Sequence, residues 1–495
     1  MKQPIAQIRH AAKWKLATCL ALALIADIFF YQQEAGWTVG GFALMVLMAV
    51  IFFHPSCLRS RIGMAATALT FGQCLILGND PNPISLSLVL TGLITMALTR
   101  TSAHYRDALN WFERMLAFIS SAGLRLFEDS ETRRRVAKRR TPQGGRFAKV
   151  LRVWTLPAIM TSVFVFLFSD ANPVLEKWLD AINWQKFFDV VTWQRILFWI
   201  AVFYGFWPLL RPKLPPALQI SLPGRNAARS GITWLFSRES IIRSLILFNL
   251  LFAMQTVMDI VYLWNGAHLP DGMTYAQYAH RGAYPLIVTA LLAAAFVLIA
   301  MRPGSDSEKS PVVHGLVYGW VAQNIFLVIS SIWRTNLYME EYSLTYLRLT
   351  ALIWMGLVAC GLILILSRMA LAKSNRWLIN MNALALAIVL YICSAANLGG
   401  IIADYNVRHC REVTGRGNQL DFAYLQSVGP AALPALEWLS ANLLVQEPST
   451  ANNIEIYNNG VVLNHLRSDL QSRMTNWRAW TFQNYRISQH NKGMI

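Results

Sequence analysis

The most polar stretches beside apolar segments lie in the second half of the chain, at residues 278–285 and 333–348. They bring cations, carboxylates and a histidine together: His280, Arg281, Arg334, Glu340, Glu341 and Arg348. The three arginines could hold an anionic group through charge-assisted hydrogen bonds, and a glutamate or the histidine could transfer a proton. The pattern therefore predicts a candidate site for an anionic group at one membrane boundary.

The same six residues also fit a structural role. They could pair among themselves and anchor helix ends at the lipid headgroups, as charged and aromatic residues commonly do at this depth. The sequence favours this structural interpretation. Both interpretations predict that Arg281, Arg334, Glu340, Glu341 and Arg348 lie in one polar patch.

Signatures of common catalytic and metal sites are missing from the sequence. It contains no H-E-x-x-H, G-x-S-x-G or Walker-type loop. The six cysteines have no C-x-x-C spacing, which argues against a metal site or a disulfide framework; they are Cys19, Cys57, Cys74, Cys360, Cys393 and Cys410. We expect no metal and no cofactor, and the missing signatures favour a protein that is not an enzyme without excluding one.

The composition is that of a membrane protein. Of the 495 residues, 55% are hydrophobic and 14% are charged, whereas soluble domains carry about 25% charged residues. Apolar stretches long enough for a bilayer core of ~30 Å occur at 15–31, 36–54, 62–78, 84–99, 153–169, 194–210, 241–264, 283–301, 312–333, 349–367 and 377–398. The predicted fold class is therefore all-α, a polytopic transmembrane helical bundle of about 11 helices.

Basic residues in the connections predict the orientation. With the N-terminus in the cytoplasm, the inner segments hold 30 of the 44 Lys and Arg residues and the outer loops hold 6. Because cations are retained on the cytoplasmic side, this orientation is favoured over its inverse. The net charge of +18 then has a sufficient partner in a lipid bilayer with an anionic inner leaflet, and no nucleic acid is required.

The spans divide the chain into four parts. We expect the first four transmembrane helices at 1–99, a basic cytoplasmic loop at 100–152, the main transmembrane bundle of about seven helices at 153–403, and a small helical tail at 404–495. A signal peptide at 1–31 is disfavoured, because no small-x-small cleavage site follows the apolar run. In the loop, Leu109, Phe112, Leu116 and Ile119 have the spacing of an amphipathic helix lying on the membrane, and a basic run follows at 133–140.

Two features of the tail can be predicted locally. Asp421 precedes an apolar pattern and should cap a helix. The polar, Asn-rich stretch at 446–459 is expected to be a loop.

Four blocks of the sequence resemble a known family. They are YAHRGAYPL at 278–286, EEYSLTYLRLTALIWM at 340–355, DYNVRHC at 404–410 and LDFAYLQSVGPAALPAL at 420–436. In order and spacing they resemble a bacterial membrane group catalogued as a domain of unknown function, DUF 4173-like and related to the DUF 4153 group. The resemblance covers about residues 190–440. It implies a bacterial inner-membrane protein with a periplasmic tail, and it carries over no catalytic residue.

Three classes of function remain open. The first is a scaffold or sensory partner in the cell envelope, with an envelope protein as its partner. The second is a transporter or lipid-moving protein that uses the outer-face site for an anionic group. The third is an outer-face enzyme acting on a lipid or glycan through Glu340, Glu341 or His280. An enclosed polar cavity would discriminate between them, because a transporter needs one that reaches the midplane, an enzyme needs one open at the outer boundary, and a scaffold needs neither.

The orientation can be tested with reporter fusions. Alkaline phosphatase, which is active only outside the cytoplasm, should be active when fused after Ser440 and inactive when fused after Arg140, because the charge bias keeps the latter inside. Activity of the Arg140 fusion would overturn the orientation.

Overall fold

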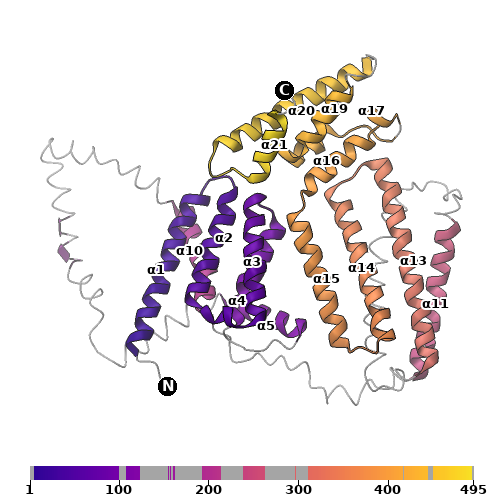
Figure 1. The fold of residues 1–495 in the computed structure, drawn as a ribbon, viewed down its shortest axis with the longest axis horizontal. Coiled ribbons are helices and arrows are strands. Elements are labelled where there is room, and N and C mark those ends of the chain that lie inside the picture. The colour runs from indigo at the N-terminus through magenta and orange to yellow at the C-terminus, as the bar shows by residue number, and fades with distance from the viewer. Residues whose placement is uncertain are drawn as a thin grey trace.

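The described part of the protein is all-helical, with upright helices standing beneath a layer of helices from the C-terminal part of the chain (Figure 1). The computed structural model describes residues 5–99, 107–122, 192–212, 238–261, 310–415, 417–443 and 450–492, with isolated positions between 154 and 161 and at 296. Every regular element in these ranges is a helix. The predicted all-α class is therefore confirmed for the part that the structure describes.

A first group of upright helices comes from the N-terminal part of the chain. Its members are α1 (Ile5–Phe30), α2 (Trp37–Phe53), a 3₁₀ turn (Pro55–Arg59), α3 (Arg61–Asn79), α4 (Pro83–Thr99), the short α5 (Ala108–Ala122) and α10 (Trp193–Leu210). Buried apolar side chains from all of them form one core. The end of α10 is bonded to this group because Lys15 Nζ and His54 Nε2 both donate to the Leu210 carbonyl, at 2.6 and 3.0 Å.

Helices α2 and α3 approach each other so closely that no side chain fits at one position between them. A Cβ atom on Gly40 would lie 2.4 Å from the backbone nitrogen of Gly78 and 2.5 Å from the carbonyl oxygen of Cys74. Small residues at a crossing let two membrane helices pack through their backbones, which compensates for the weak hydrophobic drive in lipid. Glycine is therefore required at position 40.

A second group of upright helices follows along the chain and has its own core. Its members are α11 (Arg238–Asp259), α13 (Pro311–Tyr342), α14 (Tyr346–Ala370) and α15 (Asn375–Ala395). The core surrounds Trp320, which is fully buried. Helices α13 and α14 are joined by residues 343–345 alone, so they are antiparallel neighbours. The turn ends where the Thr345 hydroxyl accepts a hydrogen bond from the Arg348 amide and caps α14.

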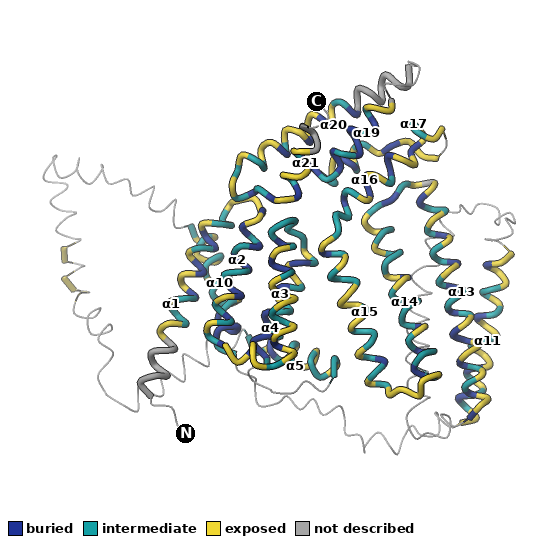
Figure 2. Tube along the Cα trace, in the orientation of Figure 1, coloured by how far each residue is buried: buried dark blue, intermediate teal, exposed yellow. Residues whose placement is uncertain are grey.

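Several helices have the length and composition of membrane spans. Five described helices qualify, namely α3, α11, residues Pro311–Glu340 of α13, α14 and α15, and the apolar α2 and α4 are shorter. Large apolar side chains are exposed along α11 and α15, and Figure 2 shows these helices mostly exposed or half-buried. Exposed apolar surface of this kind is what lipid-facing helices present.

Nine of the eleven predicted spans coincide with described helices: α1 to α4, α10, α11 and α13 to α15. The predicted spans at 153–169 and 283–301, and the basic run at 133–140, lie outside the described residues. In the predicted loop, α5 carries Leu109, Phe112, Leu116 and Ile119 on an exposed face. The predicted spans at 312–333 and 349–367 imply that residues 333–342 belong to a connection, and this was wrong, because these residues form the last turns of α13, a helix of 32 residues.

The tail comprises α16 to α21 and has a third core. Its elements are α16 (Leu398–His409), α17 (Arg411–Thr414), α18 (Phe422–Val428), a 3₁₀ turn (Gly429–Ala432), α19 (Leu433–Leu443), α20 (Thr450–Thr475) and α21 (Phe482–Lys492). Leu425, Leu436 and Leu466 are buried at its centre. The predicted cap at Asp421 is confirmed, since its carboxylate accepts a hydrogen bond from the Tyr424 amide at 2.9 Å.

The predicted loop at 446–459 was wrong over its second part, because α20 begins at Thr450. Tertiary contacts outweigh the low helix propensity of asparagine here. The buried Asn459 amide donates to the Leu436 carbonyl at 3.3 Å and to the Ser440 hydroxyl at 2.8 Å. Asn459, a polar residue of a type that is common in loops, thus joins α20 to α19.

The tail is bonded to the same end of both helix groups. On the first group, the backbone and indole N–H groups of Trp37 donate to the Trp480 and Trp477 carbonyls at 2.8 and 2.7 Å. On the second group, the buried Asn406 amide accepts from the Leu344 N–H at 2.6 Å and donates to the Leu344 carbonyl at 2.8 Å. The tail therefore bridges two groups of helices that have separate cores.

The bond between Asn406 and Leu344 should matter for stability. Asn406→Ala leaves both backbone groups of Leu344 buried without their partner, and we expect the free energy of unfolding to fall by about 2–3 kcal/mol. A lower melting temperature in detergent and faster proteolysis of the tail would report this. The exposed Asn442, which bonds only within its own helix, is the matched control, and a similar loss with Asn442→Ala would contradict the assignment.

Candidate functional site

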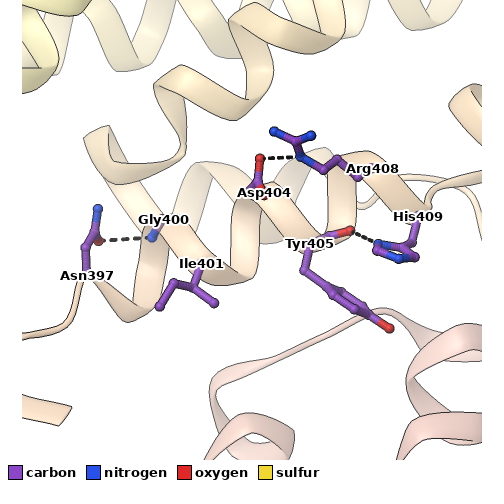
Figure 3. A pocket seen from close by; sticks show the side chains of 7 residues that line it. All are labelled: Asn397, Gly400, Ile401, Asp404, Tyr405, Arg408 and His409. Atoms are coloured by element: carbon purple, nitrogen blue, oxygen red, sulfur yellow. Dashed lines mark hydrogen bonds and ion pairs between the residues drawn. The ribbon is translucent and has the colours of Figure 1, made fainter. Parts of the chain in front are cut away.

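The helix that joins the upright helices to the rest of the tail, α16, has a shallow hollow on one face (Figure 3). Its volume is about 460 Å³, and it is lined by Asn397, Gly400, Ile401, Asp404, Tyr405, Arg408 and His409. These positions are three or four residues apart and so share one face of the helix. The opposite face is buried, because Ile402, Ala403 and Val407 are all 0% exposed.

Local sequence explains where this helix begins. Asn397 interrupts the run from α15, and its side-chain oxygen accepts a hydrogen bond from the Gly400 amide at 3.0 Å. That is the capping bond that asparagine makes at a helix N-terminus. The cap separates α16 from α15, and Figure 1 shows α16 between the upright α15 and the rest of the tail.

The charged and aromatic groups of the hollow are paired with one another. Arg408 Nε donates to Asp404 Oδ1 at 2.7 Å, and its guanidinium lies over the Trp438 ring at 5.1 Å. The His409 ring bonds the Tyr405 carbonyl at 2.8 Å and stacks on the Tyr405 ring with centroids 4.2 Å apart. An exposed ion pair flanked by stacked rings is suited to recognising a protein surface.

Burial changes the titration of two groups at or beside the hollow. Burial, together with the charge of Glu340, raises the pKa of Tyr405, so its phenol stays protonated at neutral pH. Beside the hollow, burial raises the pKa of the Cys410 thiol to about 12, which keeps it unreactive. No group of three His, Cys, Asp or Glu side chains could hold a metal ion in the ranges that the structure describes.

Arg334, one of the predicted anion-binding residues, is buried against a carboxylate. It is 6% exposed and forms an ion pair with Asp259 on α11, which is fully buried. Gln255 Nε2 donates to the same Asp259 oxygen at 3.0 Å. Because its charge is offset inside the helix group, Arg334 acts as a link between α11 and α13.

The remaining predicted residues have different surroundings. Arg348 donates to the carbonyls of Tyr342 and Ser343 in the turn before its own helix, and its guanidinium lies 4.3 Å from the Tyr338 ring centroid. Glu340 is exposed and close enough to Tyr405 to influence its pKa. His280, Arg281 and the Glu341 side chain lie outside what the structure describes.

A second ion pair, which the sequence analysis did not find, occurs in the first helix group. Arg195 Nε on α10 donates to Asp27 Oδ1 on α1 at 2.7 Å, and Trp199 Nε1 donates to the same oxygen at 3.0 Å. Both pairs had a signal in the sequence. An aspartate within an apolar span needs a cation from a neighbouring span, and each arginine stands at the same end of its span as the aspartate that it meets.

The fold defines a class of protein. Its members are helical, with several helices able to cross a membrane and a helical tail packed over the ends of those helices. Within this class, the chain belongs to the family described as Domain of unknown function (DUF4153), whose model matches residues 62–439. The resemblance of the four sequence blocks is thereby confirmed, and the match extends it to α3 and α4. No curated protein and no solved structure matches the chain.

Substitutions of Arg334 and Asp259 can distinguish a structural role of Arg334 from an anion-binding role. Arg334→Met removes the countercharge of a buried carboxylate and should destabilise the protein by about 3–5 kcal/mol, whereas Arg334→Met with Asp259→Leu should recover most of that loss. Thermal unfolding in detergent measures both. The exposed pair of Arg243 with Glu239 is the control, and Arg243→Met should have little effect. Unchanged stability of Arg334→Met would contradict the structural role.

Proposed function

We propose that this protein is a scaffold of the bacterial inner membrane, with about eleven transmembrane helices, and that its tail presents the hollow of α16 to an envelope protein partner. The observation that carries the proposal is the placement of α16. One face of this helix is bonded to the second helix group and to the core of the tail, and the opposite face is open. A rigidly held, open face is a suitable platform for a partner.

The use made of the charged residues supports a scaffold over an enzyme or a transporter. Arg195 and Arg334 are paired with buried carboxylates, and Arg348 is bonded to backbone carbonyls. Charges engaged in this way hold helices together and are not available to bind a substrate or to transfer a proton. The transporter and outer-face enzyme hypotheses would need other charged groups for those steps.

The distribution of cations supports a cytoplasmic N-terminus and a periplasmic tail. Arg59, Arg61, Arg211 and Arg376 stand at the helix ends opposite the tail (Figure 1). At the tail end, Arg195 and Arg334 are each offset by an aspartate. Among the described residues, positive charge at the helix ends opposite the tail agrees with retention beside an anionic inner leaflet.

The proposal is tested by site-specific crosslinking in cells. A photoreactive amino acid at Ile401, which is 50% exposed in the hollow, should yield a discrete crosslinked product, and one at Val461, 52% exposed on α20, should not. Adding Asp404→Ala with Arg408→Ala should abolish the product, because these side chains form the polar part of the surface. Equal products at both positions, or none at Ile401, would overturn the proposal.

A further inference from the structure

The two helix groups meet at α15 through polar contacts at its two ends. At the tail end, Gln73 Nε2 donates to the Ser394 hydroxyl at 3.0 Å, and Asn82 donates to the Ser394 carbonyl at 3.0 Å. At the opposite end, the Ala108 amide donates to Asn380 Oδ1 at 2.9 Å. Among the described residues, the apolar cores of the two groups are separate clusters. Between these contacts, the part of α15 that faces the first helix group therefore has no apolar core in common with it.

A groove of about 890 Å³ occupies this stretch, between α3 and α4 on one side and α15 on the other, with α5 at one end. Its volume is within the range of about 300–1,000 Å³ that small-molecule sites have. The walls are largely apolar, with side chains such as Leu69, Leu384 and Ile388 about half exposed into the open space. If these helices cross a membrane, the groove is accessible to the surrounding lipid.

Several polar side chains of the groove are bonded within the protein. The Thr70 and Thr95 hydroxyls donate to carbonyls of their own helices at 2.6 and 2.7 Å, and Gln73 is bonded to Ser394. These three side chains need no hydrogen bond from an occupant, and together with the largely apolar walls they make the groove suited to hydrocarbon. Along α15 it runs from Asn380 to Ile392, about 18 Å at ~1.5 Å per residue, close to the ~15 Å thickness of one leaflet.

Charge at the α5 end indicates which lipid fits. Arg61 begins α3 directly before the groove residue Ile62, and Arg376 stands near the start of α15. Both side chains are exposed, and Asp107 is 3.8 Å from Arg376. Two cations against one carboxylate favour a phosphate-bearing headgroup.

We propose that this groove binds an acyl chain of an anionic phospholipid, whose headgroup lies at the α5 end beside Arg61 and Arg376. The lipid takes the place of the missing shared core and joins the two helix groups. This site is distinct from the hollow of α16 and goes beyond the scaffold role.

The test uses the full chain reconstituted in phosphatidylcholine vesicles that contain a small fraction of phosphatidylglycerol with a photoreactive acyl chain. Mass spectrometry should find more label on residues 384–392 of α15 than on residues 247–254 of α11, whose lipid-facing side chains are more exposed. Filling the groove with Ala65→Trp and Ala387→Trp should lower the α15 label roughly tenfold, equivalent to about 1.4 kcal/mol. Ala17→Trp, at an exposed position of α1 outside the groove, should leave it unchanged.

A second pair of variants keeps the test informative if the filled groove does not fold. Arg61→Gln with Arg376→Gln should remove the preference for the phosphatidylglycerol probe over a phosphatidylcholine probe with the same chain, and Arg243→Gln on α11 should not. Label spread over α11 and α15 in proportion to exposure would show ordinary surrounding lipid and overturn the proposal. Equal labelling of the wild-type groove by both probes would also overturn it.

Discussion

A carboxylate buried between membrane helices is stable only beside a cation from a neighbouring helix, and the two halves of this protein depend on that constraint. Asp27 pairs with Arg195 and Asp259 pairs with Arg334, which joins α1 to α10 and α11 to α13. The first pair connects residues that are 168 positions apart in the chain. In lipid, where apolar packing discriminates weakly between neighbours, such pairs decide which helices lie side by side.

The ion pairs join helices within each group, and the tail joins the two groups to each other. It holds the second group through Asn406 and the first group through the turn at residues 477–480, where a Cβ atom on Gly36 would lie 2.2 Å from the Arg478 carbonyl oxygen. The contact with the first group joins α2 to the turn before α21, and both lie outside the residues 62–439 matched by the family model. Segments before and after the region matched by the family model thus pack on each other at the tail end of the molecule.

The two surfaces for which we propose binding partners differ in chemistry. The hollow of α16 is outside the upright helices and carries an ion pair and stacked rings, which suit a protein partner in water. The groove beside α15 lies among apolar helices, of which α3 and α15 are long enough to cross a membrane, and several of its polar side chains are bonded within the protein, which suits hydrocarbon. A contact between helix groups that has few buried apolar side chains is also where a structure opens most readily.

The sequence by itself determined the helices at nine of the predicted spans, because apolar runs of membrane length have no other stable form in lipid. It also determined the cap at Asp421 and the family, each of which depends on neighbours along the chain. Only the tertiary structure decided that Arg334 meets Asp259 and is thereby engaged inside the helix group, that residues 333–342 continue α13, and that Asn459 belongs to a helix. These features depend on partners that are distant in the sequence. No local sequence pattern identifies the partner of a charged group or an amide.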